Sequence, residues 1–208
     1  MSFSRLLFAR RTWAAVGVGA LLTLPPMFCR GQDAPGERDI TKPPRWAVMT
    51  GTDADVARVK TPATPTTIAD LLAQPRPSLL APGTLDPSFR RHRAGRAETT
   101  EWSVDALLVG AQINDDGDYH LVMRDASGHT LTGELPDPAR MGQPSRFAGG
   151  MRAARSVLVH RLHPGEKPLA VHVPIRVVGL GYWGRAGKGP GGMGNGIQLH
   201  PITGIEFR

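Results

Sequence analysis

The sequence predicts a mainly β protein, in which five strands and one helix follow a proline-rich arm. The 208 residues include 25 Gly and 19 Pro, which favours short elements joined by turns over long helices. From residue 98 onward, three strand patterns are followed by one helical pattern and two more strand patterns. We therefore expect three regions, which are a leader at 1–31, an arm at 32–97 and a β domain at 98–208.

The first three strands are expected to form a meander. Residues 102–113 (WSVDALLVGAQI) alternate and carry β-branched side chains, and residues 119–125 (YHLVMRD) alternate again. The sequence NDDG between them is typical of a hairpin turn, because Asn, Asp and Gly tolerate positive φ. A second turn, ASG, leads to a third strand at 129–135 (HTLTGEL).

A helix and two more strands complete the expected domain. Apolar residues recur at helical spacing within 146–161, and strand patterns follow at 173–183 and 196–207. Three meandering strands, a helix and two strands is the order of an OB-like Greek-key barrel of five strands. In that fold the helix between strands three and four closes one end of the barrel.

The first 31 residues have the order of a secretory signal peptide. Basic residues come first, an apolar run covers 13–28, and small residues precede Gln32. Arg10 and Arg11 partly match a twin-arginine signal, so export by the general or the twin-arginine route stays open. We expect a periplasmic or secreted protein after cleavage near Gly31 and Gln32, with no transmembrane segment in the mature chain.

Charge and cysteine content exclude several classes of site. The formal net charge is +7, but four arginines lie in residues 1–31, and without them 21 basic residues face 18 acidic ones. Such a balance does not by itself indicate a nucleic-acid or membrane partner. Cys29 is the only cysteine, so the mature chain is expected to lack disulfides, a thiol nucleophile and a zinc-thiolate site.

The arm carries two ordered segments and a basic cluster. Residues 46–59 are expected to form one strand or turn against the main body. Thr67 and Asp70 have the spacing of a capping box, which predicts a short helix near 67–74. The basic cluster consists of Arg90, Arg91, His92, Arg93 and Arg96. We interpret this cluster as a solvated tether, with capture of a polyanion as the alternative.

Several segments resemble a known family. The runs DDGDYHLVMRD and NGIQLHPI, with VVGLGYWG between them, are similar to a family of small exported bacterial OB-fold-like proteins of uncharacterised function. The resemblance extends upstream to RVKTPATPTTIADLLAQPRP and covers most of the mature chain. It implies an exported β-rich protein, and it implies no particular activity, substrate or catalytic residue.

The hairpin and third strand also resemble, more weakly, the start of staphylococcal-type nucleases, which share the OB barrel. That resemblance implies a calcium ion held by carboxylates, and the candidates here are Glu134 and Asp137. It also implies an arginine that faces the phosphate, and Arg124 or Arg140 could take this role. The spacing does not reproduce the nuclease arrangement of Asp, Glu and paired Arg. We therefore assign no catalytic residue.

The glycine-rich segment 184–196 joins the last two expected strands at the rim of the barrel, where OB folds commonly bind oligonucleotides or sugars. Aromatic and basic side chains near it would supply stacking surfaces and charge. The candidate binding residues are Tyr119, His120, Tyr182, Trp183, Arg185 and Lys188. Stacking by Trp183 requires that its ring be accessible, whereas the alternative is that Trp183 belongs to the core.

Two functional hypotheses remain. The favoured one is a non-enzymatic binding or interaction module, without a cofactor, whose partner is an oligonucleotide, an oligosaccharide or an envelope protein. The alternative is a metal-dependent, nuclease-like phosphodiesterase that requires calcium. Added calcium separates the two, because only the second hypothesis predicts cleavage of single-stranded DNA.

The leader gives a first testable prediction. Because the basic, apolar and small-residue regions stand in the order that signal peptidase requires, the mature N-terminus should be Gln32. Mass spectrometry of the exported protein measures this end directly. Recovery of the complete chain as an integral membrane protein would contradict the prediction.

Overall fold

A computed structural model describes residues 45–80, 87–186 and 194–208. The chain divides between Asp39 and Ile40, and every described element belongs to the unit 40–208. Six strands dominate this unit: β1 (Lys60–Thr66), β2 (Thr100–Ile113), β3 (Tyr119–Arg124), β4 (Thr130–Leu135), β5 (Leu169–Trp183) and β6 (Ile197–Phe207). The expected mainly β class is confirmed.

The strands form one mixed sheet in the order β1-β2-β3-β4-β6-β5, and an additional pairing between β2 and β5 closes five of them into a ring. Pairing is antiparallel except for β1 with β2 and β4 with β6. The expected count of five strands is wrong, because β1 adds a sixth. Its sequence, KTPATPT, has two prolines and no apolar alternation, so no strand pattern was visible there.

The expected hairpin between β2 and β3 is confirmed. The N–H of Asn114 donates to Asp118 O at 2.8 Å, and the N–H of Gly117 donates to Asn114 O at 2.8 Å. Gly117 has φ +83°, a value that glycine adopts without steric cost. Alternation then directs side chains of the strands into a common core that includes Val104, Leu108, Leu121, Met123, Leu131, Ile175, Val177 and Ile202.

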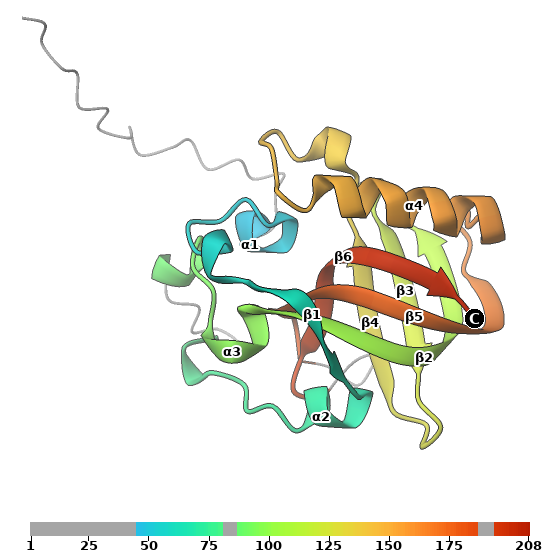
Figure 1. Ribbon diagram of the computed structural model, residues 1–208, viewed down its shortest axis with the longest axis horizontal. Coiled ribbons are helices and arrows are strands. Elements are labelled where there is room, and N and C mark those ends of the chain that lie inside the picture. Colours follow the sequence, from blue (N-terminus) through green and yellow to red (C-terminus); the bar gives the residue numbers. More distant parts are fainter. Residues whose placement is uncertain (1–44, 81–86, 187–193) are drawn as a thin grey trace, which may run out of the picture. The chain divides into compact units, whose positions relative to one another are not determined.

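Helix α4 (Ala148–Leu162) follows β4, close to the expected 146–161, after the single 3-10 turn η4 (Pro138–Arg140). It packs on β6 through Met151, Ala154 and Leu158, all buried. The approach is close, because a Cβ at Gly150 would lie 2.5 Å from Thr203 O. In Figure 1, α4 lies above the strands, and the arm elements lie to the left of them and below.

Apart from β1, the described part of the arm consists of short helices. These are α1 (Trp46–Thr50), α2 (Ile68–Leu72) and α3 (Gly95–Glu98), with 3-10 turns η1 (Val56–Arg58), η2 (Ser78–Leu80) and η3 (Pro87–Arg90). The strand or turn expected at 46–59 is therefore partly wrong, since it begins as a helix. Helix α2 has the expected capping box, in which Asp70 N donates to Thr67 Oγ1 at 3.0 Å.

Two buried ion pairs join distant segments of the arm. Arg45 and Glu98 have side chains 4% and 0% exposed and are joined by two hydrogen bonds of 2.7 and 2.6 Å. Arg93 and Asp53 form a second pair with both side chains fully buried, at 2.6 Å. The interpretation of the basic cluster as a solvated tether is thus wrong for Arg93, because Asp53 lies forty positions upstream and sequence spacing does not reveal the contact.

These pairs predict the effect of removing one charge. Glu98→Gln leaves the buried Arg45 guanidinium uncompensated, so we expect the free energy of unfolding to fall by about 3 kcal/mol. Asp105→Asn is the matched control, because Asp105 binds Arg176 with the same two-bond geometry while both side chains are largely exposed. The control should cost less than about 1 kcal/mol. Equal losses in urea melts would contradict the prediction.

Candidate binding site

The outer face of β3 and β4 carries a hydrogen-bonded pair, His120 and Glu134. These residues are direct partners in the antiparallel register, so their side chains leave the sheet on the same side. His120 Nδ1 lies 2.5 Å from Glu134 Oε1. The two side chains are 26% and 16% exposed, so a ligand in solution can reach the pair.

Two more polar side chains lie on this face beneath the pair. Thr132 precedes Glu134 by two positions, and the parallel register of Gly133 with Leu199 brings Glu134 beside His200 of β6. Both Thr132 and His200 are buried, at 4% and 1% exposure. Within the described chain, Thr132 Oγ1, Glu134 Oε2 and both ring nitrogens of His200 are buried and have no hydrogen-bond partner.

Unpaired buried polar atoms are costly, because each loses its bonds to water without replacement. Four such atoms on neighbouring positions of two strands concentrate this cost in one place. We name this cluster of His120, Thr132, Glu134 and His200 the β3–β4–β6 face. A ligand whose hydroxyls both donate and accept hydrogen bonds would satisfy it.

The pKa values of the two histidines of this face are shifted in opposite directions. The hydrogen bond to the Glu134 carboxylate raises the pKa of His120 against the effect of its partial burial. Complete burial, together with the charge of His120, lowers the pKa of His200 to about 3. At neutral pH His200 is therefore an uncharged ring with one donor and one acceptor nitrogen.

Tyr182 of β5 borders the face on its buried side. Its ring packs edge-on against His200, with 5.5 Å between ring centroids, and the Arg45 guanidinium lies 5.3 Å from the tyrosine ring. Burial raises the pKa of Tyr182 to about 12, so the phenol stays neutral. Through Arg45 the arm thus contributes directly to the shape of this face.

The rim residues expected from the sequence are not assembled into a stacking surface. Trp183 is 3% exposed and belongs to the core, because its backbone N–H donates to Glu98 at 2.8 Å and Arg76 lies 5.9 Å from its ring. Its ring offers no accessible face for stacking, contrary to the requirement stated above. Tyr119 is also buried, with Arg155 4.5 Å from its ring. Arg185 is exposed, and Lys188 lies outside the described residues.

The carboxylates of the nuclease resemblance serve other contacts. Glu134 binds His120, while Asp137 begins η4 and accepts a hydrogen bond from Ala139 N at 3.0 Å. Arg140 donates to the backbone oxygen of Asp116. Within residues 45–80, 87–186 and 194–208, no three His, Cys, Asp or Glu side chains are placed to hold a metal ion.

Comparison with known proteins adds no assignment, since neither a protein-family model nor a curated protein sequence matches this chain. In the part of the chain that the structure describes, no helix has the length and apolar character needed to span a membrane.

The sequence predicted His120 as a binding residue but did not predict the residues that surround it. Glu134 was predicted only as a metal ligand, and no pattern linked His200 to either residue. The signal for His200 was present, because Ile197 and Leu199 alternate with Gln198 and His200, which predicts the histidine on the outer face. What the sequence lacked was the pairing of β4 with β6, which brings that histidine beside Glu134.

A buried carboxyl group next to the start of β3 makes the stability of the protein depend on pH. Asp118 is 3% exposed and accepts a hydrogen bond from Asp137 N at 3.0 Å. Burial, reinforced by the charges of Asp116 and Glu134, raises the pKa of Asp118 from 3.8 to about 6. The folded protein therefore resists ionisation of a group that ionises readily in the unfolded chain.

Asp118→Asn should stabilise the protein at pH 8, where the carboxylate is ionised in both states. With about 1.4 kcal/mol for each unit of pKa difference, we expect a gain of about 1–3 kcal/mol. The gain should shrink as the pH falls from above 6 and vanish below about 4, where both states are protonated. Urea melts of both proteins measure the difference. A gain that stays constant from pH 8 to pH 4 would contradict an ionisation effect.

Proposed function

We propose that the closed ring is an OB-like Greek-key barrel to which β1 is added as a sixth strand. The ring order β2-β3-β4-β6-β5 supports this assignment, as does the position of α4 between the third and fourth strands of the ring. In OB folds, ligands commonly bind on the face of the second and third strands, which correspond here to β3 and β4.

On this barrel the β3–β4–β6 face is the binding site of an exported, non-enzymatic binding module. The observation that carries the proposal is the partly exposed His120–Glu134 pair lying over buried polar atoms that lack partners in the described chain. Such atoms are rare in native proteins, where nearly all buried polar groups find a hydrogen bond. A ligand or ordered water that enters beside Glu134 would supply the missing bonds.

Of the three partner classes, a neutral oligosaccharide fits this face best. Sugar hydroxyls would donate to the partly exposed Glu134 carboxylate, and an ordered water beneath it would both donate to and accept from the buried His200 and Thr132. An oligonucleotide is disfavoured, because Glu134 repels phosphate and the aromatic rings that would stack on bases are buried. An envelope protein would need a larger apolar centre than this polar cluster provides.

The test is a titration of the full chain with uncharged hexasaccharides and, separately, with a single-stranded oligonucleotide. At least one hexasaccharide should bind, and the double variant His120→Ala, Glu134→Gln should weaken that binding about tenfold or more, since hydrogen bonds to a charged group contribute about 1.5–3 kcal/mol. The double variant His129→Ala, Asp125→Asn is the control, because it removes an exposed His–Asp pair of 2.9 Å on the same hairpin.

Three outcomes would overturn the proposal. They are no binding of any hexasaccharide, equal weakening by the control variant, and tighter binding of the oligonucleotide. Calcium is then added to the oligonucleotide sample. Calcium-dependent cleavage would favour the nuclease-like phosphodiesterase instead.

A further inference from the structure

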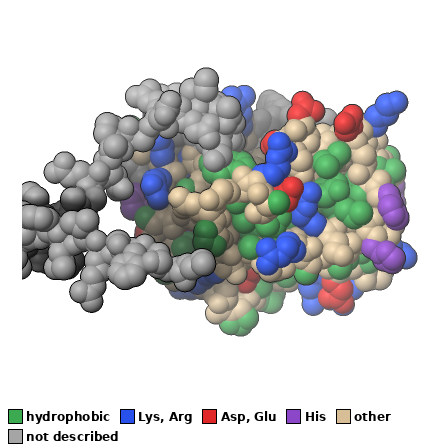
Figure 2. All heavy atoms as spheres, turned by 90° about the horizontal axis from the view of Figure 1, so that it is seen from above, with side chains coloured by type: hydrophobic (Ala, Val, Ile, Leu, Met, Phe, Trp, Pro, Cys, Tyr) green, Lys and Arg blue, Asp and Glu red, His purple; other side chains and the backbone are tan. Residues whose placement is uncertain are grey.

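The charged side chains of the segment that contains α4 are all basic. Residues 138–165 include five arginines and two histidines, and no Asp, Glu or Lys. The modest overall charge balance hides this asymmetry. Figure 2 views the molecule from the α4 side and shows Lys and Arg side chains spread over this face, with Asp and Glu side chains from other segments between them and histidines at its right-hand edge.

Two adjacent rows of side chains form the solvent-facing side of α4. One row is Arg152, Ser156 and His160, the other is Ala153, Val157 and Arg161, and all six residues are exposed. Val157 is 40% exposed and is one of the two exposed large hydrophobic side chains in the described chain. We call these six residues the α4 face. It combines uncompensated positive charge with an apolar centre.

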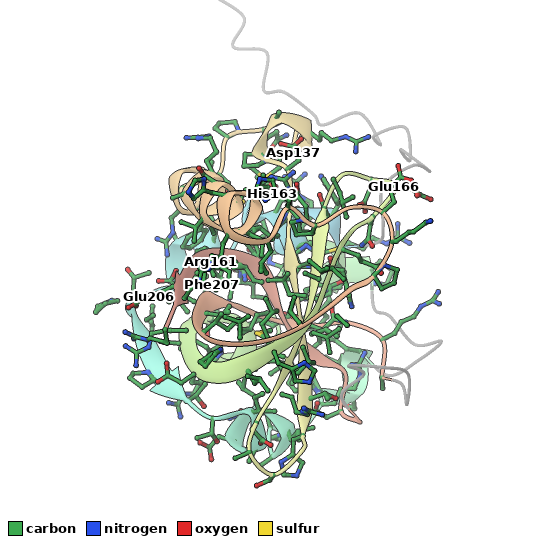
Figure 3. The ribbon with its side chains drawn as sticks, turned by 90° about the vertical axis from the view of Figure 1, so that its right-hand side faces the viewer. Asp137, Arg161, His163, Glu166, Glu206 and Phe207 are labelled. Atoms are coloured by element: carbon green, nitrogen blue, oxygen red, sulfur yellow. The ribbon has the colours of Figure 1, made fainter. Side chains whose placement is uncertain are left out.

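Two of the acidic groups near this face are engaged in other contacts. Asp137 accepts a hydrogen bond at the start of η4, and Glu206 is bound to Arg208. Glu166 follows the helix, beyond His163. Figure 3 labels these acids together with Arg161 and Phe207. Arg161 lies 5.9 Å from the Phe207 ring, and neither Arg152 nor Arg161 belongs to any of the ion pairs found among the described residues.

We propose that the α4 face binds the surface of a membrane that contains anionic phospholipids. This interaction is separate from the β3–β4–β6 face and does not depend on the function proposed for it. The guanidinium groups pair with headgroup phosphates, and Val157 contacts the boundary between headgroups and acyl chains. All the cations of the segment are arginines, whose planar fork matches phosphate geometry.

A nucleic acid is the other polyanion to consider, and the face fits it less well. Single-stranded nucleic acids bind to grooves with exposed aromatic rings. Here Phe147 is buried with Arg146 4.7 Å from its ring, and Phe207 is partly buried beside Arg161. The α4 face instead exposes an aliphatic side chain on the outer side of one helix, along which Arg152 and Arg161 can meet a flat surface together.

The experiment measures contact at the helix itself, so that the apolar run at 13–28 does not decide the result. In the full chain with Cys29→Ser, an environment-sensitive fluorophore is attached through Ser156→Cys or, as a control position, Leu79→Cys on the arm. Leu79 is the second exposed large hydrophobic residue. Each protein is mixed with phosphatidylcholine vesicles that either contain or lack phosphatidylglycerol.

The label at position 156 should shift its emission only with the anionic vesicles, and about 1 M salt should abolish the shift, because the screening length then falls to about 3 Å. The charge reversal Arg152→Glu, Arg161→Glu should raise the lipid concentration that gives half of the emission shift by at least about 20-fold. The reason is that each arginine near an anionic surface increases the membrane affinity about 5-fold. The control Arg90→Glu, Arg91→Glu makes the same change of net charge on the arm and should have no such effect.

Several results would overturn the proposal. One is an equal shift at position 79, which would mean contact without preference for α4. Another is an equal loss with the control charge reversal, which would mean that only net charge matters. No shift at position 156 with anionic vesicles would exclude the membrane, and a shift produced instead by an oligonucleotide would assign the face to nucleic acid.

Discussion

The buried carboxylate of Glu98 is the contact on which the rest of the structure depends. Its two oxygens accept four hydrogen bonds of 2.6–2.8 Å, two from Arg45 and one each from the backbone N–H groups of Ala94 and Trp183. An ion with no exposed surface is tolerated only when it is fully paired in this way. One side chain therefore joins the first described residue of the arm, the arm's last helix and the end of β5.

The same contact determines the shape of the candidate site. The end of β5 is held against the arm so closely that a Cβ at Gly181 would lie 2.0 Å from Ala97 O. Arg45, anchored on Glu98, covers Tyr182, and Tyr182 in turn packs on His200. The arm thus closes the inner side of the β3–β4–β6 face and leaves His120 and Glu134 at its outer, accessible side. The arm, although proline-rich like a linker, therefore lines one side of the candidate site.

Local patterns predicted the elements well, whereas contacts between distant segments could not be predicted. Alternation located β2 to β6 within a few residues, and helical spacing located α4. The parallel pairing of β4 with β6 has no local signal, so Glu134 and His200 could not be joined. Trp183 was chosen for its residue type and its place at a strand end, but its burial depends on Arg76 and Glu98, more than eighty positions upstream.

The arginines show why the net charge of the chain does not describe the charge of its surface. Arg45 and Arg93 lie inside the structure, where Glu98 and Asp53 neutralise them, so they contribute little to the external field. Those buried pairs remove acids and bases from the surface in equal numbers. The arginines of α4 have no acid within their own segment, and solvent screening makes only nearby charges count. The net charge of the whole chain therefore does not describe this side of the molecule, where α4 carries three arginines and no acid.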